Sequence, residues 1–290
     1  MYGAILGDIA GSEYEFDPVT AKDFPFHGFI TDDSILTVAI QYAFIEYGLN
    51  PTTEQFSKAL DKFALKFKFY KGAGWGANFY GWIADPHPYG SKGNGIASHV
   101  SPAGWIASSE QEALQLAVRI ANATHNTDEG RRAAKAIALA IYMARNGKTK
   151  EEIGKRMKEF YPTMEPYSSY LGHYRYSELA EESVPQSIAT FLDSNSLSDT
   201  IKKAILLKGD ADTMAAISGS IAEALYGSSA VEGEAVFEAF GLSLDSNKVN
   251  LLRSTLKSFK ELLLAIGHFK LSESSIGDYW FSREDSPDFK

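Results

Sequence analysis

Apolar residues recur at spacings of three and four along much of the chain, which is the period of a helix with one buried face. The clearest stripe runs from Ile35 to Ile45, and Gly48 marks its end. Signals for β-strands are scarce. The pattern therefore predicts an all-α fold, a compact multi-helix single domain. Similar helical stripes lie within residues 113–121, 133–143, 217–225 and 249–266.

Two segments interrupt the helical pattern. Residues 71–104 contain eight glycines and three prolines, and long loops within compact domains are usually functional or disordered. Trp75, Phe79 and Trp82 favour order, since disordered segments are poor in aromatic residues. These rings could stack on a nucleobase, but packing within the loop is the commoner role. Residues 161–176 form a second irregular stretch, with five tyrosines.

Composition narrows the class of protein. With 290 residues, of which 44% are hydrophobic, the chain can bury a sizeable core. It has no cysteine, which excludes disulfides and zinc–thiolate sites and fits a reducing cytoplasm. The net charge of −9 argues against general binding of nucleic acid or an anionic membrane. The start of the chain lacks a basic signal-peptide region, and no apolar run approaches the roughly 20 residues of a membrane span. We expect a soluble, cytoplasmic protein.

Two acidic motifs stand where apolar helices begin, Thr31–Ser34 and Asp210–Thr213. Each alone is typical of a helix N-cap, where hydroxyl and carboxylate oxygens accept hydrogen bonds from free backbone amides. Together they form an all-oxygen set of the kind that selects Mg²⁺ or Mn²⁺. Two such ions can orient a diol and activate a water. The spacing in the chain does not show whether the two motifs meet.

The order of several blocks along the chain resembles the ADP-ribosylglycohydrolase family, the group that includes the dinitrogenase-reductase-activating glycohydrolase. The similarity covers residues 3–229, and residues 230–290 look particular to this chain. We expect the first part to be the helical domain of this family and the second to be a helical extension packed on it. The blocks are GAILGDIAGS at 3–12, TDDS at 31–34, SKGNGIA at 91–97, ATHN at 123–126, VPQSI at 184–188 and GDADTMAAISG at 209–219.

The resemblance implies a site that binds ADP-ribose, with two Mg²⁺ or Mn²⁺ ions near its distal ribose. Glu15 matches an acidic residue that helps catalysis or closes over the substrate, and Asp33 and Asp212 are further candidates for proton transfer. Asp8 is expected to tie neighbouring segments together. The implied metal ligands are Thr31, Asp32, Asp33, Asp210, Asp212 and Thr213. The implied substrate-binding residues are Gly93, Asn94, Gly95, Ser98, His99 and His125.

The chain departs from the family pattern at two places. Members often carry Met-Arg where this chain has Ser98-His99, which would weaken or replace a basic substrate contact. Lys208 stands where a glycine is common, and it would add a charge and crowd the turn. Neither change removes an implied metal ligand.

The implied activity is hydrolysis of the C1″ glycosidic bond of an ADP-ribosylated protein or other acceptor, which releases ADP-ribose. The alternative is a catalytically weak ADP-ribose-binding or immunity-type module on the same fold. The sequence leaves open the linkage cleaved, the choice of Mg²⁺ or Mn²⁺, the oligomeric state and the role of residues 230–290.

Overall fold

The structure is a computed structural model that describes residues 2–16, 28–228 and 244–268. Within these ranges the chain is helical, and its β pairing is limited to an isolated bridge between Gly93 and Leu179. The expectation of an all-α fold is confirmed. The helices are α1 (Gly3–Gly11), α2 (Asp32–Tyr47), α3 (Thr53–Phe67), η1 (Lys71–Ala73), α4 (Ala77–Ala84), α5 (Gly95–His99), α6 (Ser101–Ile106), α7 (Glu110–Ala121), α8 (Asp128–Arg145), α9 (Lys150–Met157), α10 (Tyr167–Tyr170), α11 (Ala180–Asp193), α12 (Leu197–Leu206), α13 (Ala211–Tyr226) and α15 (Ser246–Ala265).

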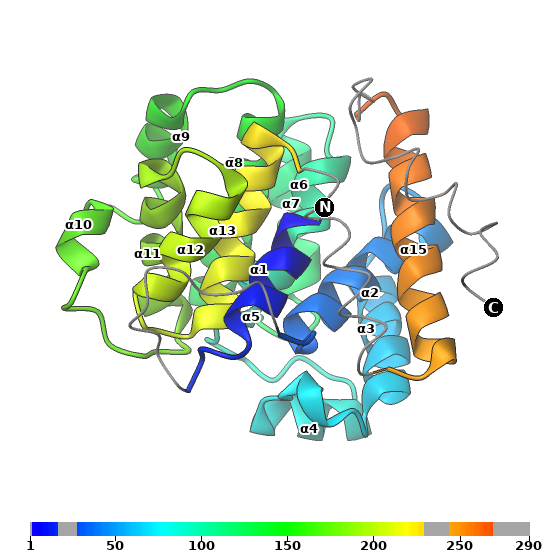
Figure 1. Ribbon diagram of the computed structural model, residues 1–290. Coiled ribbons are helices and arrows are strands. Elements are labelled where there is room, and N and C mark those ends of the chain that lie inside the picture. The colour runs from blue at the N-terminus through cyan, green and yellow to red at the C-terminus, as the bar shows by residue number, and fades with distance from the viewer. Residues whose placement is uncertain (1, 17–27, 229–243, 269–290) are drawn as a thin grey trace, which may run out of the picture.

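Helix α13 lies at the centre of the bundle, where it packs against α1, α8, α11 and α12 (Figure 1). Its contact with α1 is made by the backbones themselves. A Cβ atom at Gly7 would lie 2.1 Å from the carbonyl oxygen of Ala215, and one at Gly11 would lie 2.4 Å from the Cα atom of Asp212. Only glycine permits this approach. The close packing sets the end of α1 against the start of α13.

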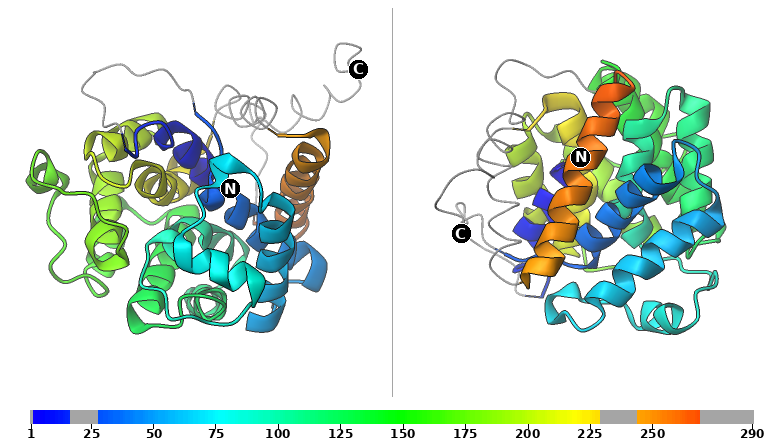
Figure 2. Two further views of the ribbon diagram at one scale, coloured as in Figure 1. Left: turned by 90° about the horizontal axis from the view of Figure 1, so that it is seen from below. Right: turned by 90° about the vertical axis from the view of Figure 1, so that its right-hand side faces the viewer.

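Helix α2 connects this centre to a second group of helices, formed with α3 and α15 (Figure 1). The views in Figure 2 show α15 beside α2 from two further directions. Phe44 of α2 meets Phe259 of α15 with ring centroids 6.4 Å apart. The predicted stripes at 35–45 and 249–266 are thus the buried faces of two helices that pack together. The expected bounds, a family domain over residues 1–229 and a helical extension of it over residues 230–290, stay a prediction.

The expectation of one long loop over residues 71–104 was wrong in part. The segment contains η1, α4, α5 and the start of α6, and burial of Phe79, Trp82 and Ile83 stabilises α4 despite the flanking glycines. Pro102 lies in the first turn of α6, where its missing N–H would have had no partner within the helix. Phe79 stacks on both Trp75 and Trp82, with centroids 5.3 and 5.0 Å away, and all three rings are buried.

None of the helices in the described part of the chain combines the length and apolar character that crossing a membrane requires.

Candidate active site

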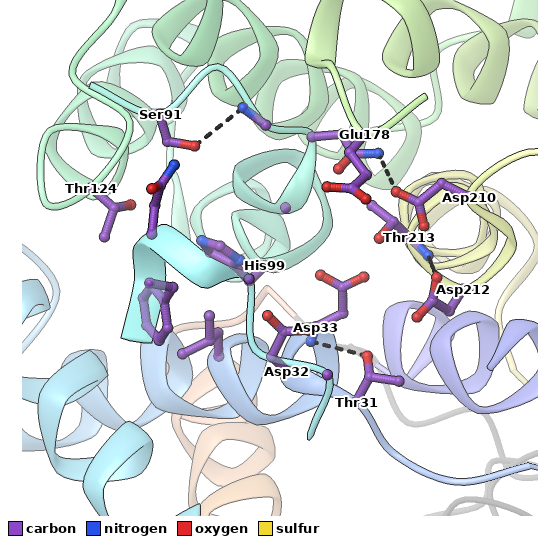
Figure 3. Close-up of a pocket in the computed structure, with 18 of the residues that line it drawn as sticks. Thr31, Asp32, Asp33, Ser91, His99, Thr124, Glu178, Asp210, Asp212 and Thr213 are labelled. Atoms are coloured by element: carbon purple, nitrogen blue, oxygen red, sulfur yellow. Dashed lines mark hydrogen bonds between the residues drawn. The ribbon is translucent and has the colours of Figure 1, made fainter. Parts of the chain in front are cut away.

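A cavity of about 860 Å³ opens where α2 and α13 begin. Figure 3 shows Thr31, Asp32 and Asp33 on one side of it, facing Asp210, Asp212 and Thr213 on the other. The two acidic motifs therefore meet in space, although they lie far apart in the sequence. The rest of the wall includes the segment after α1, the region of η1 and α4, helix α5 with the segment before it, Thr124 and His125, and the segment before α11.

Asp8 lies behind the α2 side of the cavity and holds the start of α2 through hydrogen bonds. Its buried carboxylate accepts hydrogen bonds from the backbone N–H of Thr31 at 2.9 Å, the Thr31 hydroxyl at 2.6 Å and the backbone N–H of Ser34 at 3.1 Å. The Ser34 hydroxyl also donates to it. Burial nevertheless raises the pKa of Asp8 to about 6. Asp8 ties α1 to the start of α2, as the sequence led us to expect.

The α13 side is held by different partners. The Asn94 side-chain amide donates to Asp210 Oδ2 at 2.7 Å, which links the segment before α5 to the start of α13. Asp212 Oδ1 accepts from the backbone N–H of Thr213 at 2.8 Å. The Thr213 side chain lies near both Asp33 and Asp210, where it offsets part of the rise that burial causes in their pKa values. Thr213 is therefore close to both acidic motifs.

The carboxylates lie close enough to share cations. Oxygens of Asp8, Asp33 and Asp212 all lie within 4.8 Å of one another, and so do oxygens of Glu15, Asp210 and Asp212. Burial, followed by the charges of neighbouring carboxylates, raises the pKa values of Asp33 and Asp212 well above the ordinary range. Asp33 Oδ2 is buried and has no hydrogen-bond partner among the described residues. These features fit a cation site with oxygen ligands.

Asp32 takes a different position from Asp33. It lines the cavity and is partly exposed, and it belongs to neither of the two close groups of carboxylates. Its pKa is raised well above the ordinary range, first by burial and then by the charge of Asp33.

Glu15 stands at the edge of the cavity with two residues that the sequence reading did not single out for the site. The Tyr176 hydroxyl lies 3.1 Å from Glu15 Oε1 and 3.0 Å from Glu178 Oε1, and it can donate its hydrogen to either. Burial, followed by the charge of Asp210, raises the pKa of Glu15 to about 7. The tyrosine-rich stretch at 161–176 was noticed in the sequence, but nothing there indicated that Tyr176 would reach Glu15.

Comparison with known proteins identifies the family of the chain. Residues 1–245 match the family described as ADP-ribosylglycohydrolase. The chain belongs to the ADP-ribosylglycohydrolase family. It is similar to the ADP-ribosylarginine hydrolase Tri1 of Pseudomonas putida (strain GB-1), with 28% identity over 190 residues, which are 59% of this chain and 46% of that protein. The match thus spans about half the length of this curated relative.

A solved structure titled "ADP-ribosylglycohydrolase-related protein complex" has a similar fold. The two chains superpose with a TM-score of 0.62 and are 20% identical, over 89% of this chain and 96% of the other. At this identity the likeness concerns the fold.

The segment with the family's GNG block lines the cavity next to Asp33 and Asp210. Gly93, Asn94 and Gly95 all contribute to the wall, and the backbone N–H of Asn94 donates to the carbonyl of Glu178 at 2.8 Å. Ser98, which we expected among the substrate-binding residues, is absent from the cavity wall. It is buried, and its hydroxyl donates to Asp33 Oδ1. Its place on α5 is therefore behind Asp33.

His99 and His125 both line the cavity and are both buried. Their rings meet edge to face, with centroids 6.2 Å apart. His125 Nδ1 lies 2.7 Å from the hydroxyl oxygen of Thr124. Burial lowers the pKa of each histidine to about 3, so both rings are neutral at physiological pH.

The backbone at Lys208 has a conformation that favours glycine, the residue common at this position in the family. Among the described residues it is the one non-glycine residue with a positive φ, at 60°. The next residue, Gly209, lies against Tyr174, where a Cβ atom would come 2.2 Å from the ring. The turn before Asp210 thus keeps its shape at a cost in backbone strain. Lys208 does not line the cavity, so its charge, which we expected beside the implied metal ligands, stays outside the wall.

Proposed function

We propose that the protein is a metal-dependent hydrolase that cleaves the C1″ glycosidic bond of an ADP-ribosylated target and releases ADP-ribose. The observation that carries the proposal is the meeting of Asp33 with Asp210 and Asp212 in one cavity. Family membership supports the choice of ADP-ribose as the ligand. The all-oxygen donor set and the unpartnered, buried Asp33 Oδ2 support the need for cations.

Two Mg²⁺ or Mn²⁺ ions are the proposed cofactors. The proposed ligands are Thr31, Asp32, Asp33, Asp210, Asp212 and Thr213. When bound, such ions would neutralise the acidic cluster and supply Lewis-acid assistance to the ribose and to water. The protein's own contribution is to hold these oxygens in place. Asp8 fixes the start of α2, and Asn94 fixes Asp210.

Glu15, Asp33 and Asp212 are the proposed proton-handling residues. Cleavage of a glycosidic bond passes through a transition state with oxocarbenium character, in which carboxylates stabilise positive charge and accept or deliver protons. Glu15 lies at the edge of the cavity, where Tyr176 restrains its carboxylate. That position suits a residue that exchanges a proton with water or with the departing acceptor.

The cavity wall supports binding of the rest of the ligand. Gly93 and Gly95 allow the backbone to approach a ligand closely, and backbone amides can bind phosphate without adding net charge. Together with Asn94, Ser98, His99 and His125, they are the proposed substrate-binding set, with Ser98 acting through Asp33. The cavity of about 860 Å³ lies within the range of small-molecule sites.

The acceptor is proposed to be an ADP-ribosylated protein. A relative named as an ADP-ribosylarginine hydrolase favours an arginine linkage over the alternatives. The net charge of −9 does not favour nucleic acid as a general partner. The absence of cysteine supports the cytoplasm as the place of action.

The test measures release of ADP-ribose from arginine-linked and serine-linked peptides, with Mg²⁺ and with a chelator. We expect metal-dependent release that falls about a hundredfold or more in Asp33→Asn and in Asp210→Asn. Asp85→Asn is the matched control, because the Asp85 side chain is 86% exposed and lies outside the cavity wall. Full activity in either site variant would refute the metal assignment. Binding of ADP-ribose without release from either peptide would favour the binding-module alternative.

A further inference from the structure

His99 is a buried histidine in the cavity wall whose ring nitrogens have no partner among the described residues. Its side chain is 3% exposed, and neither ring nitrogen has a hydrogen-bond partner among the residues that the structure describes. The ring lines the cavity, and Figure 3 shows it between Thr124 and Asp33. Buried polar atoms without partners are rare in native proteins, and each needs a reason. Because His99 lines the cavity, a ligand group that enters the cavity could supply the missing hydrogen-bond partners.

The place of His99 limits which part of a ligand it can meet. It follows Ser98 on α5, whose hydroxyl is bound to Asp33. A Cβ atom at Gly95, one turn earlier, would lie 3.9 Å from Asp33 Oδ1. His99 is thus beside the α2 end of the acidic cluster. A ligand group that contacts His99 therefore also lies close to these carboxylates.

The chemistry of the ring limits the group further. A neutral imidazole presents one N–H donor and one nitrogen acceptor. The low pKa that burial and His125 cause keeps the ring neutral. A phosphate oxygen only accepts hydrogen bonds, so it would leave the acceptor nitrogen of His99 without a partner. A hydroxyl group can both accept and donate, and sugars carry such groups in pairs.

We infer that His99 binds a ribose hydroxyl beside the acidic cluster and makes the site selective for ligands that carry sugar hydroxyls there. The inference deepens the proposed function, on which it rests, by assigning a selectivity residue to the distal ribose of ADP-ribose. His125 differs from His99 because its Nδ1 already has Thr124 as a partner.

The experiment compares the affinities of ADP-ribose and ADP by calorimetry in the presence of Mg²⁺. ADP ends at the phosphate and lacks the distal ribose, so it serves as the probe without the relevant hydroxyls. The variants are His99→Phe, which keeps a flat ring but removes both nitrogens, and His99→Gln, which restores a donor and an acceptor. His87→Phe is the matched control, since its side chain is 61% exposed and does not line the cavity.

We expect His99→Phe to bind ADP-ribose about tenfold more weakly, the size of one net hydrogen bond, and to bind ADP as the wild type does. His99→Gln should recover most of the loss, and His87→Phe should change neither affinity. An equal loss for both ligands, or no loss for ADP-ribose, would overturn the inference and leave the proposed function standing. Failure of the wild-type protein to bind ADP-ribose would instead refute the proposed function. If His99→Phe does not fold, His99→Ala provides the same comparison.

Discussion

Replacing Asp33 with asparagine should change the stability of the protein in opposite directions with and without cations. The substitution removes one negative charge from the cluster of Asp8, Asp33 and Asp212 and leaves the side chain's shape nearly unchanged. The amide oxygen can still accept from Ser98, as Asp33 Oδ1 does. The amide nitrogen would replace the unpartnered Oδ2 and could donate to a neighbouring carboxylate. Without cations, the variant should therefore be more stable than the wild type.

The size of the gain follows from the geometry. Two fully ionised carboxylate oxygens within 4.8 Å of each other repel by about 3 kcal/mol or more at an effective dielectric constant of about 20. The raised pKa values of Asp8 and Asp33 lower the ionised fraction of the cluster at a given pH, so the repulsion is smaller than this full value. We expect the variant to gain about 1–3 kcal/mol in its free energy of unfolding without cations.

The pH dependence has a defined sign. Because the pKa of Asp33 is raised in the folded protein, the folded state holds this proton more tightly than the unfolded state does. The wild type therefore loses stability as the pH rises above the unfolded value of about 4. The advantage of Asp33→Asn should be small near pH 4 and largest at pH 7 or above.

Thermal unfolding in chelator and in Mg²⁺ provides the assay. A cation at about 100 times its dissociation constant stabilises the folded state by about 2.7 kcal/mol, which corresponds to a rise in Tm of about 5 °C or more. The wild type should show this rise, Asp33→Asn should lose most of it, and Asp85→Asn should behave as the wild type. If Asp33→Asn is less stable than the wild type in chelator, or keeps the full response to Mg²⁺, the cluster does not hold cations through Asp33.

Three further predictions concern backbone and burial. Lys208→Gly should raise the free energy of unfolding by about 1 kcal/mol, because glycine adopts the φ of 60° without strain, whereas Lys208→Ala should not. Gly7→Ala should destabilise the protein by about 3 kcal/mol, because the new Cβ atom would meet the α13 backbone. Gly81→Ala, where a Cβ atom would have open space around it, should be neutral or stabilising. Denaturant titration measures the free energy of unfolding of both variants. His99 is neutral in the folded protein, so the unfolded chain takes up its proton first as the pH falls. Lowering the pH from 7 to 5 should therefore reduce the free energy of unfolding by about 2 kcal/mol through this residue. His99→Phe should lose correspondingly less stability over this range, and an equal pH dependence in the variant and the wild type would contradict the low pKa of His99.

The sequence by itself determined the class of fold and the kind of polar atoms at the candidate site. Helical spacing placed the buried faces of α2 and α15, and Gly48 ends α2 with the positive φ that favours glycine. Thr31 caps α2 by accepting from the backbone N–H of Asp33, as the acidic motif indicated. These features could be read because helix periodicity and capping depend on residues a few positions apart.

The tertiary structure alone decided that the acidic motifs meet and which residues complete the site. Asp33 and Asp210 come together because α1 packs backbone to backbone on α13 at Gly7, and because Asp8 links α1 to α2. Tyr176 reaches Glu15 across a similar separation in sequence. No local pattern records such contacts, since they depend on how whole helices pack rather than on the residues next to them in the chain.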